Sequence, residues 1–355
     1  GKAGMEQYYE TYLRGKNGEQ KFYIDNVGRI SEIISSTDSV AGDDLYLSID
    51  ADLQKATYLA LQNEIAAIVY SNIKSGEIPI NDVYTALIGN SVINTEHFSK
   101  AKASDTEKNV LSVFKSRQKT TLGKIKQELT SSPEALNTMS DEVLDEFTYI
   151  ISMLKDDQVL LKNEIDTSDS VYQKWKDQKI SPKEYLNYCI TQHWIDISQL
   201  NVDEKYADST EVYDALCKYI LKNIKTDTEF SKIIYQYMIT RGEISPRQLC
   251  LILFDQGVLD YDDATVNKLK NGSLSPRDFL MKKIYNIEIT PAQLALEPCT
   301  GSCVVTDEKT GEIRAMVSYP GYDSNKLANG VDSEYFASLQ HDKSSPLLNY
   351  ATQQK

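Results

Sequence analysis

The spacing of apolar residues divides the chain into three stretches, of which the first covers residues 1–50. Between positions 5 and 13, methionine, tyrosine and leucine recur at helical spacing. Gly15 follows where a helix would end, so we expect a short helix there. Leu45, Leu47 and Ile49 then alternate with polar residues, which predicts a half-buried strand.

A helical pattern begins at Asp50 and continues, with interruptions, to about residue 298. Either Asp50 or Asp52 can cap the first helix, because a carboxylate accepts hydrogen bonds from the free amides of a first turn. One face of this helix collects apolar residues, and a helix of that kind packs on a core. The residues of the face are Leu53, Ala56, Ala60, Leu61, Ile65 and Ile68.

Four helix-start signals support a block of ordinary helices. Each combines a hydroxyl residue, a proline directly after it, and an acid or amide at the third position, which is the pattern of a capped first turn. The signals begin at Ser181, Ser245, Ser275 and Thr290. Their spacings of 64, 30 and 15 residues suggest no repeat, so we do not expect a solenoid.

From about residue 300 the pattern returns to strands. Segments 302–307 and 312–318 flank Glu308-Lys309-Thr310-Gly311, with glycine where a positive φ is needed, and this predicts a β-hairpin. Tyr319-Pro320-Gly321 ends the second strand, and residues 332–355 are typical of mixed loop and helix. The expected fold class is α+β, with a mainly helical block between two sheet-forming ends.

Length and charge narrow the class of protein. The chain has 355 residues, enough for two or three domains, with 38 basic and 52 acidic side chains and a net charge of −14. Such an acidic chain is a poor binder of nucleic acid phosphates. No apolar run is long enough to span a bilayer, and no signal segment opens the chain, which begins at Gly1. We expect a piece of a larger protein.

Five cysteines are too few for a disulfide scaffold, and an odd number leaves at least one unpaired. Cys189 with His193, and Cys299 with Cys303, stand four residues apart, but two ligands do not make a zinc site. We interpret the cysteines as small buried hydrophobic residues and expect neither metal nor cofactor. They do not indicate a cellular compartment.

Most catalytic templates are missing. No nucleophile elbow, zinc-protease helix, phosphate-binding loop or dinucleotide-binding glycine motif occurs in the sequence. A calcium loop at Asp323, Asn325 and Glu334 is rejected, because Leu327 and Ala328 occupy its fifth and sixth positions. Acidic doublets are more typical of solvated faces or helix starts than of acid–base pairs. They occur at 43–44, 156–157 and 262–263.

Serine followed by lysine at the third position occurs five times, and about three matches are expected by chance. Such a pair could in principle activate a serine, because both side chains share a helix face. No S-x-N tripeptide occurs, and Lys309-Thr310-Gly311 lies in the hairpin turn, so we regard the set as noise. The pairs are Ser71–Lys74, Ser99–Lys102, Ser112–Lys115, Ser116–Lys119 and Ser152–Lys155.

The two ends nevertheless resemble the class B penicillin-binding proteins. At the front, residues 1–18 are similar to the G-x-x-G-[LM]-E…Y…L-x-G-x-x-G stretch of that family's pedestal. Residues 42–54 resemble the G-x-[DN]-L-x-L-[TS]-I-D-x-x-[LV]-Q start of its transpeptidase domain. At the back, residues 301–325 look like the first hairpin of that domain and its exit. Residues 346–352 are similar to the approach to its active-site helix.

The resemblance implies a domain plan. Residues 1–42 would end the pedestal or dimerisation domain, 43–61 would begin the transpeptidase domain, 62–298 would be a helical insertion, and 299–355 would continue the transpeptidase domain. The family's P-G-S-T-x-K nucleophile motif is expected just after Lys355, so we assign no catalytic residue. The family-matching positions are Gly4, Glu6, Tyr9, Arg14, Gly15, Gly18, Asp50, Gln54, Asp307, Gly311, Pro320, Asp323, Asn325, Pro346 and Asn349.

For function, the resemblance implies a parent enzyme that cross-links peptidoglycan stem peptides by serine acyl transfer and binds β-lactams, while this chain alone is expected to be inactive. Alternatives are an interaction or spacer module in residues 62–298 that contacts cell-wall synthesis proteins, or a truncated homologue that acts as a scaffold. The resemblance also implies a location at the extracytoplasmic face of a bacterial cell membrane, because the family is anchored by one N-terminal membrane helix with these domains outside. That anchor is not expected in this chain. No nucleic acid partner is expected.

Overall fold

The computed structural model describes residues 4–131, 134–200, 202, 208–328 and 330–353. Within them the fold class is the expected α+β, because two small antiparallel sheets accompany a mainly helical block. The chain forms two compact units. One comprises residues 1–57 and 304–317, and the other comprises 58–303 and 318–355. The predicted pedestal, transpeptidase and insertion boundaries remain a prediction.

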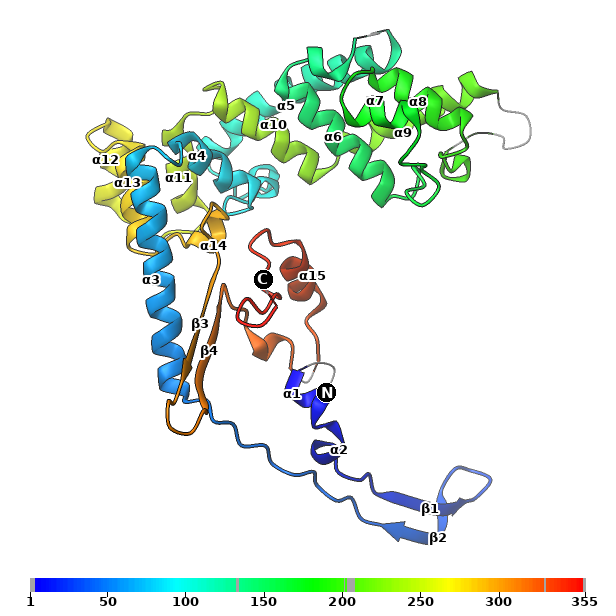
Figure 1. The fold of residues 1–355 in the computed structure, drawn as a ribbon, viewed down its shortest axis with the longest axis vertical. Coiled ribbons are helices and arrows are strands. Elements are labelled where there is room, and N and C mark those ends of the chain that lie inside the picture. The colour runs from blue at the N-terminus through cyan, green and yellow to red at the C-terminus, as the bar shows by residue number, and fades with distance from the viewer. Residues whose placement is uncertain (1–3, 132–133, 201, 203–207, 329, 354–355) are drawn as a thin grey trace. The chain divides into compact units, whose positions relative to one another are not determined.

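The first unit contains the sheet-forming segments, coloured blue and orange in Figure 1. Its elements are the helices α1 (Gly4–Tyr8) and α2 (Glu10–Leu13), the hairpin β1 (Glu19–Ile24) and β2 (Ile30–Thr37), the start of α3 (Ala51–Ser75), and most of the hairpin β3 (Gly301–Thr306) and β4 (Ile313–Tyr319). The helix expected over positions 5–13 is thus two short helices, interrupted at Tyr9.

The strand expected at Leu45–Ile49 is wrong, because residues 41–47 and Ile49 have no regular structure. Leu45 and Leu47 are 38% and 55% exposed. Among the described residues, the segment reaches a strand through the Ser48 hydroxyl, which donates to the Ile313 carbonyl, and through the Asp50 amide, which donates to the Arg314 carbonyl. Alternation alone therefore does not build a ladder here, since a strand needs a partner along its length.

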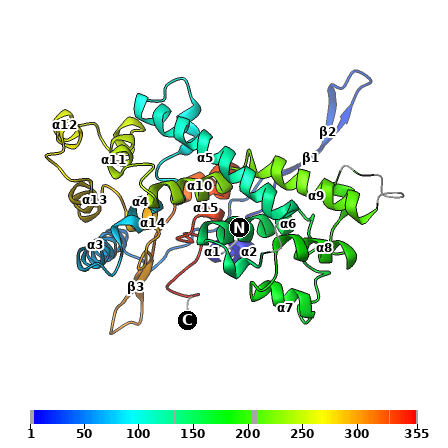
Figure 2. The ribbon, with the colours of Figure 1, turned by 90° about the horizontal axis from the view of Figure 1, so that it is seen from above.

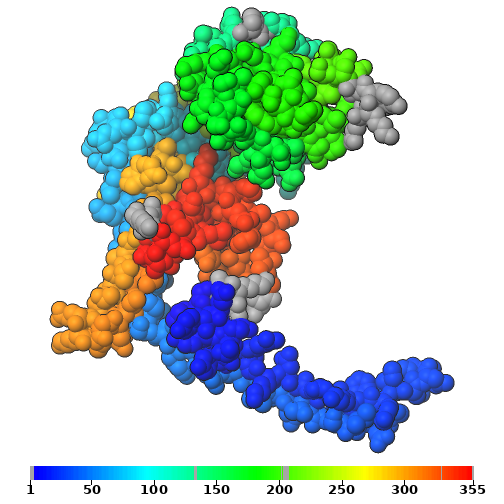
Figure 3. Space-filling view, turned by 45° about the vertical axis from the view of Figure 1, so that its right-hand side comes forward, coloured from blue at the N-terminus to red at the C-terminus, as the bar shows by residue number. Residues whose placement is uncertain are grey.

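The second unit is a helical block around one continuous core, which runs from Ile65 to Leu294 and includes Tyr319. In both Figure 1 and Figure 2, α5, α6, α9 and α10 pack together, with α11, α12 and α13 grouped at the other end of the block. Figure 3 shows the surface over α6 to α9, in green, as one closely packed mass. No described helix is long and apolar enough to cross a membrane.

The second unit contains the rest of α3 and these further elements. The α-helices are α4 (Ile80–Gly89), α5 (Asp105–Thr130), α6 (Asp141–Asp156), α7 (Ser170–Lys176), α8 (Pro182–Thr191), α9 (Ser209–Ile224), α10 (Thr228–Thr240), α11 (Pro246–Asp255), α12 (Asp263–Asn271), α13 (Pro276–Tyr285), α14 (Pro291–Leu294) and α15 (Ser333–His341). The 3₁₀ helices are η1 (Thr95–Ser99), η2 (Leu136–Thr138), η3 (Ile197–Gln199) and η4 (Ser324–Lys326).

All four predicted helix starts are confirmed. Ser181, Ser245, Ser275 and Thr290 are the N-caps of α8, α11, α13 and α14, and each side-chain oxygen accepts a hydrogen bond from the amide three residues later. Proline occupies the first turn of all four helices, where its missing N–H costs no hydrogen bond. The sequence around each cap was therefore sufficient to predict where the helix begins.

One turn recurs between the helices, which the spacings of the four helix-start signals did not indicate. A residue with positive φ follows a helix, and in most copies the residue two positions later donates to a carbonyl six residues back. At Gly242, for example, the Ile244 amide donates to the Met238 carbonyl at 3.3 Å. At Gln178 and His193 the next residue donates instead to a carbonyl five residues back. The positive-φ residues fall at 15-residue intervals in three runs: Ser91 after Gly76, His193 after Gln178, and Ile287 after Gly242, Gly257 and Gly272.

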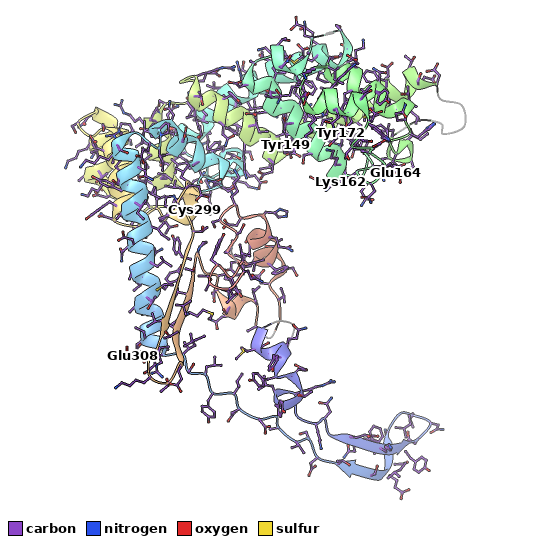
Figure 4. The ribbon with its side chains drawn as sticks, viewed as in Figure 1. Tyr149, Lys162, Glu164, Tyr172, Cys299 and Glu308 are labelled. Atoms are coloured by element: carbon purple, nitrogen blue, oxygen red, sulfur yellow. The ribbon has the colours of Figure 1, made fainter. Side chains whose placement is uncertain are left out.

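Tyrosine–aspartate hydrogen bonds connect α6 to its neighbours. Tyr149 of α6, labelled in Figure 4, donates to Asp227, the N-cap of α10, at 2.8 Å. Tyr237 of α10 donates back to Asp145 of α6 at 2.6 Å, and Tyr219 of α9 donates to Asp157 at 2.9 Å. Burial and the carboxylate partners raise the pKa values of all three tyrosines.

A buried charged cluster ties α5, α6 and α10. Glu142, 3% exposed, accepts from Arg117 at 3.0 and 3.1 Å and from Arg241 at 2.6 Å. Glu146 lies one turn further along α6 and is 1% exposed, but its Oε1 has no hydrogen-bond partner. Burial and the neighbouring Glu142 carboxylate raise the pKa of Glu146 to about 8. The cluster thus holds one carboxylate that is paired with two arginines and a second that is buried with one oxygen lacking a hydrogen-bond partner.

Candidate functional site

The start of α3 is fastened to strand β4 by the side chain of Gln54. Its amide nitrogen donates to the Met316 carbonyl at 2.6 Å, and its amide oxygen accepts from the Met316 N–H at 2.8 Å. A primary amide presents the same donor and acceptor pair as a peptide group, so Gln54 acts as a one-residue strand partner for β4. We call this pair of hydrogen bonds the Gln54 clasp.

Asp50 and Ser48 extend the connection toward the start of β4. The Asp50 carboxylate accepts from the Leu53 amide at 3.0 Å and so caps α3, which decides between the two predicted caps. The Asp50 N–H donates to the Arg314 carbonyl at 2.9 Å, and the Ser48 hydroxyl donates to the Ile313 carbonyl at 2.7 Å. Residues 48–54 thus follow β4 from Ile313 to Met316, although they lie more than 260 residues away in sequence.

The turn of the β3–β4 hairpin is organised by Asp307. Its carboxylate accepts from the amides of Lys309 and Thr310 at 2.8 and 3.1 Å, and these amides lower the pKa of Asp307. Gly311 has φ +75°, as its position in the turn required, and Glu308 lies at the tip (Figure 4). Lys309-Thr310-Gly311 therefore forms the turn of the β3–β4 hairpin, as predicted from the sequence.

Three glycines bring two backbone segments of the first unit into direct contact. Lys16 and Val40 exchange hydrogen bonds of 2.8 and 2.9 Å, and the Asp43 amide donates to the Tyr12 carbonyl at 2.9 Å. A Cβ on Gly15 would lie 2.7 Å from the Gly42 nitrogen, one on Gly18 would lie 2.9 Å from the Ser39 nitrogen, and one on Gly42 would overlap the Leu13 carbonyl. Only glycine fits at these positions.

The other family-matching positions near the N-terminus make fewer contacts within the first unit. Gly4 begins α1 with φ +58°, Glu6 is exposed on α1, and the Arg14 amide closes α2 on the Glu10 carbonyl at 3.0 Å. The Tyr9 ring lies 4.8 Å from the Tyr8 ring and 6.3 Å from the Tyr12 ring. The first three residues of the predicted front motif lie outside the described residues.

In the second unit, Asn349 organises the segment that the resemblance places before the active-site helix. Its Oδ1 accepts from the Ser318 hydroxyl at 3.2 Å and from the Ala351 amide at 3.1 Å. Its N–H donates to the Gln353 side chain at 3.0 Å, and its carbonyl accepts from the Gln353 amide at 2.8 Å. Pro346 is buried nearby in sequence. Lys355, after which the nucleophile motif is expected, lies outside the described residues.

The exit from β4 packs on α3. The Tyr319 ring lies 5.6 Å from the Tyr58 ring, and the Tyr58 hydroxyl accepts from the Gly321 amide at 3.4 Å. Pro320 is buried and follows a cis peptide bond. Asp323 caps η4 by accepting from the Asn325 amide at 3.0 Å, so two of the three residues of the rejected calcium loop have a structural role.

The described residues present no group that resembles an activated nucleophile. In none of the five serine–lysine pairs is the hydroxyl hydrogen-bonded to the lysine, and Ser152 Oγ instead contacts Asp156 at 3.5 Å. Among the same residues no cluster of histidine, cysteine and acidic side chains could hold a metal. Burial raises the pKa values of Cys189 and Cys250 to about 12 and those of Cys217 and Cys299 to about 11, which makes them poor nucleophiles.

Four members of these contacts could not be predicted from the sequence: Gly42, Ser48, Tyr58 and Met316. Gly42 and Ser48 lie inside the segment that carried the resemblance, but their partners Leu13 and Ile313 are distant in sequence. No local pattern could have found the Met316 backbone, because its identity as a partner depends on strand register.

The chain is similar to penicillin-binding proteins and to peptidoglycan D,D-transpeptidases. Residues 1–47 match the family model of the penicillin-binding protein dimerisation domain. The peptidoglycan D,D-transpeptidase MrdA of Salmonella typhimurium is 35% identical over 78 residues, which are 22% of this chain and 12% of that protein. No solved structure matches the chain.

Two further relatives are also peptidoglycan D,D-transpeptidases. The peptidoglycan D,D-transpeptidase FtsI of Escherichia coli K12 is 34% identical over 111 residues, 31% of this chain and 18% of that protein. The peptidoglycan D,D-transpeptidase PbpA of Mycolicibacterium smegmatis is 46% identical over 57 residues, 15% of this chain and 12% of that protein. The chain thus spans between 12% and 18% of the length of these relatives.

Proposed function

Since this chain carries the sequence of a class B penicillin-binding protein, we propose that residues 1–61 and 299–355 form part of the frame of a peptidoglycan D,D-transpeptidase. The observation that supports this most directly is the Gln54 clasp. It joins the two stretches that resemble the family into one local structure, although 262 residues separate Gln54 from Met316. A transpeptidase domain interrupted by a long insertion has this property.

The chemistry proposed for the whole protein is acyl transfer. A serine attacks the D-Ala-D-Ala carbonyl of a stem peptide, D-alanine leaves, and an amine of a neighbouring strand takes the acyl group, while β-lactams acylate the same serine. We assign this chemistry to the whole protein rather than to residues 4–353, because none of the described serine–lysine pairs is hydrogen-bonded. We place the whole protein at the outer face of a bacterial cytoplasmic membrane.

A fluorescent penicillin tests the proposal. The whole natural protein should become covalently labelled, and an unlabelled β-lactam added first should prevent the labelling. The 355-residue chain, treated in the same way, should stay unlabelled. Absence of label on the whole protein, under conditions that label Escherichia coli FtsI, would refute the assignment. Label on the 355-residue chain would place the nucleophile within it.

Residues 62–298 are proposed to be a non-catalytic insertion. Their continuous core fits either an interaction module, with cell-wall synthesis proteins or the wall itself as partner, or a spacer. An interaction role is favoured by an open groove beside α6 and α7, which is lined by two lysines without acidic partners.

A further inference from the structure

A groove of about 350 Å³ lies in the second unit where η2, α6 and α7 meet. Its walls combine apolar side chains, hydroxyls and two cations, and no acidic residue lines it. The lining residues are Leu136, Leu144, Thr148, Ile151, Ser152, Lys155, Trp175, Lys176 and Gln178. The groove is open to solvent rather than enclosed in the core, so a ligand can reach it without local unfolding.

Along α6, the side chains that line the groove change from apolar to hydroxyl-bearing to cationic. Leu144, Thr148, Ser152 and Lys155 follow one another at helical spacing and form a stripe that begins apolar and ends cationic. At 1.5 Å per residue the stripe from Leu144 to Lys155 is about 16 Å long. An extended peptide advances about 3.3 Å per residue, so four or five residues match this length.

The lysines of the groove are available for a ligand. Among the described residues, no carboxylate lies within 4 Å of the Lys155 or Lys176 ammonium. Asp177, which follows Lys176 in sequence, forms its ion pair with Lys179 at 2.7 Å and feels the Lys176 charge only from beyond ion-pair distance. In a chain of net charge −14, two unpaired cations beside an apolar wall favour an anionic ligand.

Trp175 gives the groove a fixed apolar wall. Its ring stacks on the ring of buried Tyr185, with centroids 4.4 Å apart and planes within 6° of parallel. Because the indole is held in place, a ligand side chain that packs on it loses its own conformational freedom without ordering the protein. Thr148 and Ser152 also line the groove. Their hydroxyls donate to the Leu144 carbonyl at 2.8 Å and to Asp156 at 3.5 Å, so both oxygens can still accept a hydrogen bond from a peptide N–H.

From these features we propose that the groove is an accessory, non-catalytic site for the carboxylate-bearing stem peptide of peptidoglycan. The peptide carboxylates lie toward Lys155 and Lys176, and its small apolar side chains face Leu144 and Trp175. The choice of the stem peptide rests on the proposed function, since the relatives are named as peptidoglycan D,D-transpeptidases. Such a site would hold a strand of the polymer near the enzyme between reactions.

The test is a titration of the 355-residue chain with a synthetic stem pentapeptide ending in D-Ala-D-Ala, followed by calorimetry and tryptophan fluorescence. The double variant K155Q/K176Q should weaken binding about fivefold, because partly exposed ion pairs contribute about 0.2–1 kcal/mol each. The matched control K162Q/K174Q removes the same charge from exposed lysines outside the groove and should leave binding unchanged. The pentapeptide amidated at its C-terminus should bind more weakly than the free acid.

Three results would overturn the proposal: no saturable binding, equal binding by K155Q/K176Q and by the control, or equal binding of the amidated peptide. An all-L acidic peptide that binds as tightly as the stem peptide would reassign the groove to a protein partner. Penicillin labelling of the whole protein decides the proposed function separately. A labelled protein with no peptide binding refutes only the groove.

Discussion

The Gln54 clasp can be tested by replacing Gln54 with leucine. Leucine is an apolar side chain with one heavy atom fewer, and it removes both hydrogen bonds to Met316, at 2.6 and 2.8 Å. The Met316 N–H and C=O are then left without their protein partner in a half-buried position. At about 1 kcal/mol of net stability for each hydrogen bond, we expect the free energy of unfolding of the first unit to fall by about 2 kcal/mol.

Two measurements would report this change. Urea unfolding gives the loss of stability, and amide hydrogen exchange resolves it by residue, with faster exchange expected at Met316. The control K55L introduces the same residue at an exposed position of the same helix and should leave Met316 unchanged. The reasoning is refuted if Q54L exchanges at Met316 as slowly as the unmodified protein, because the clasp would then not protect β4.

Three other predictions concern stability. Glu146→Gln should stabilise the protein more at pH 8 than at pH 5. The pKa of Glu146 is raised from 4.5 to about 8 in the folded state. The stability of the unmodified protein is therefore fully present below pH 4.5 and is lost as the pH rises through 8, whereas glutamine does not ionise. The gain is on the order of 3 kcal/mol by urea unfolding, and equal gains at both values would contradict it. Gly42→Ala should cost at least about 2 kcal/mol and expose the Lys16 and Val40 amides to exchange, whereas Gly123→Ala, with open space around its Cβ, should be neutral or stabilising. Because burial raises the pKa values of Cys189, Cys250 and Tyr84 to about 12, the urea midpoint should fall steadily between pH 9 and 12, and a constant midpoint would contradict this.

Local signals in the sequence predicted the features whose causes are local. A serine or threonine before proline caps a helix through its own side chain, so Ser245 and Thr290 could be assigned without knowledge of the tertiary fold. Gly311 could be placed for the same reason, since the hairpin turn required a positive φ. The α+β class followed from the change in period at each end of the helical block.

Features that depend on distant partners could not be predicted in this way. Leu45–Ile49 has the alternation of a strand, but among the described residues only its end reaches β4. The turn that recurs every 15 residues could not be recognised from the sequence, because its positive-φ residue varies among glycine, serine, glutamine, histidine and isoleucine. The more constant signal was the apolar residue two positions later, such as Ile244 or Leu259, which is buried and closes the turn.

The recurring turn also suits the proposal that residues 62–298 are a long insertion within a transpeptidase frame. Each unit of helix and turn closes its own backbone hydrogen bonds and contributes one apolar face, so units can be added without altering a sheet. What the frame requires is that the chain returns to its starting point. It does so within the second unit, where a Cβ on Gly301 would lie 3.2 Å from Ile65 and 3.3 Å from Leu61. The absence of a side chain at Gly301 therefore lets the first residue of β3 pack directly on α3. The two ends of the proposed insertion thus lie close together, which is the arrangement that lets a domain tolerate an inserted one.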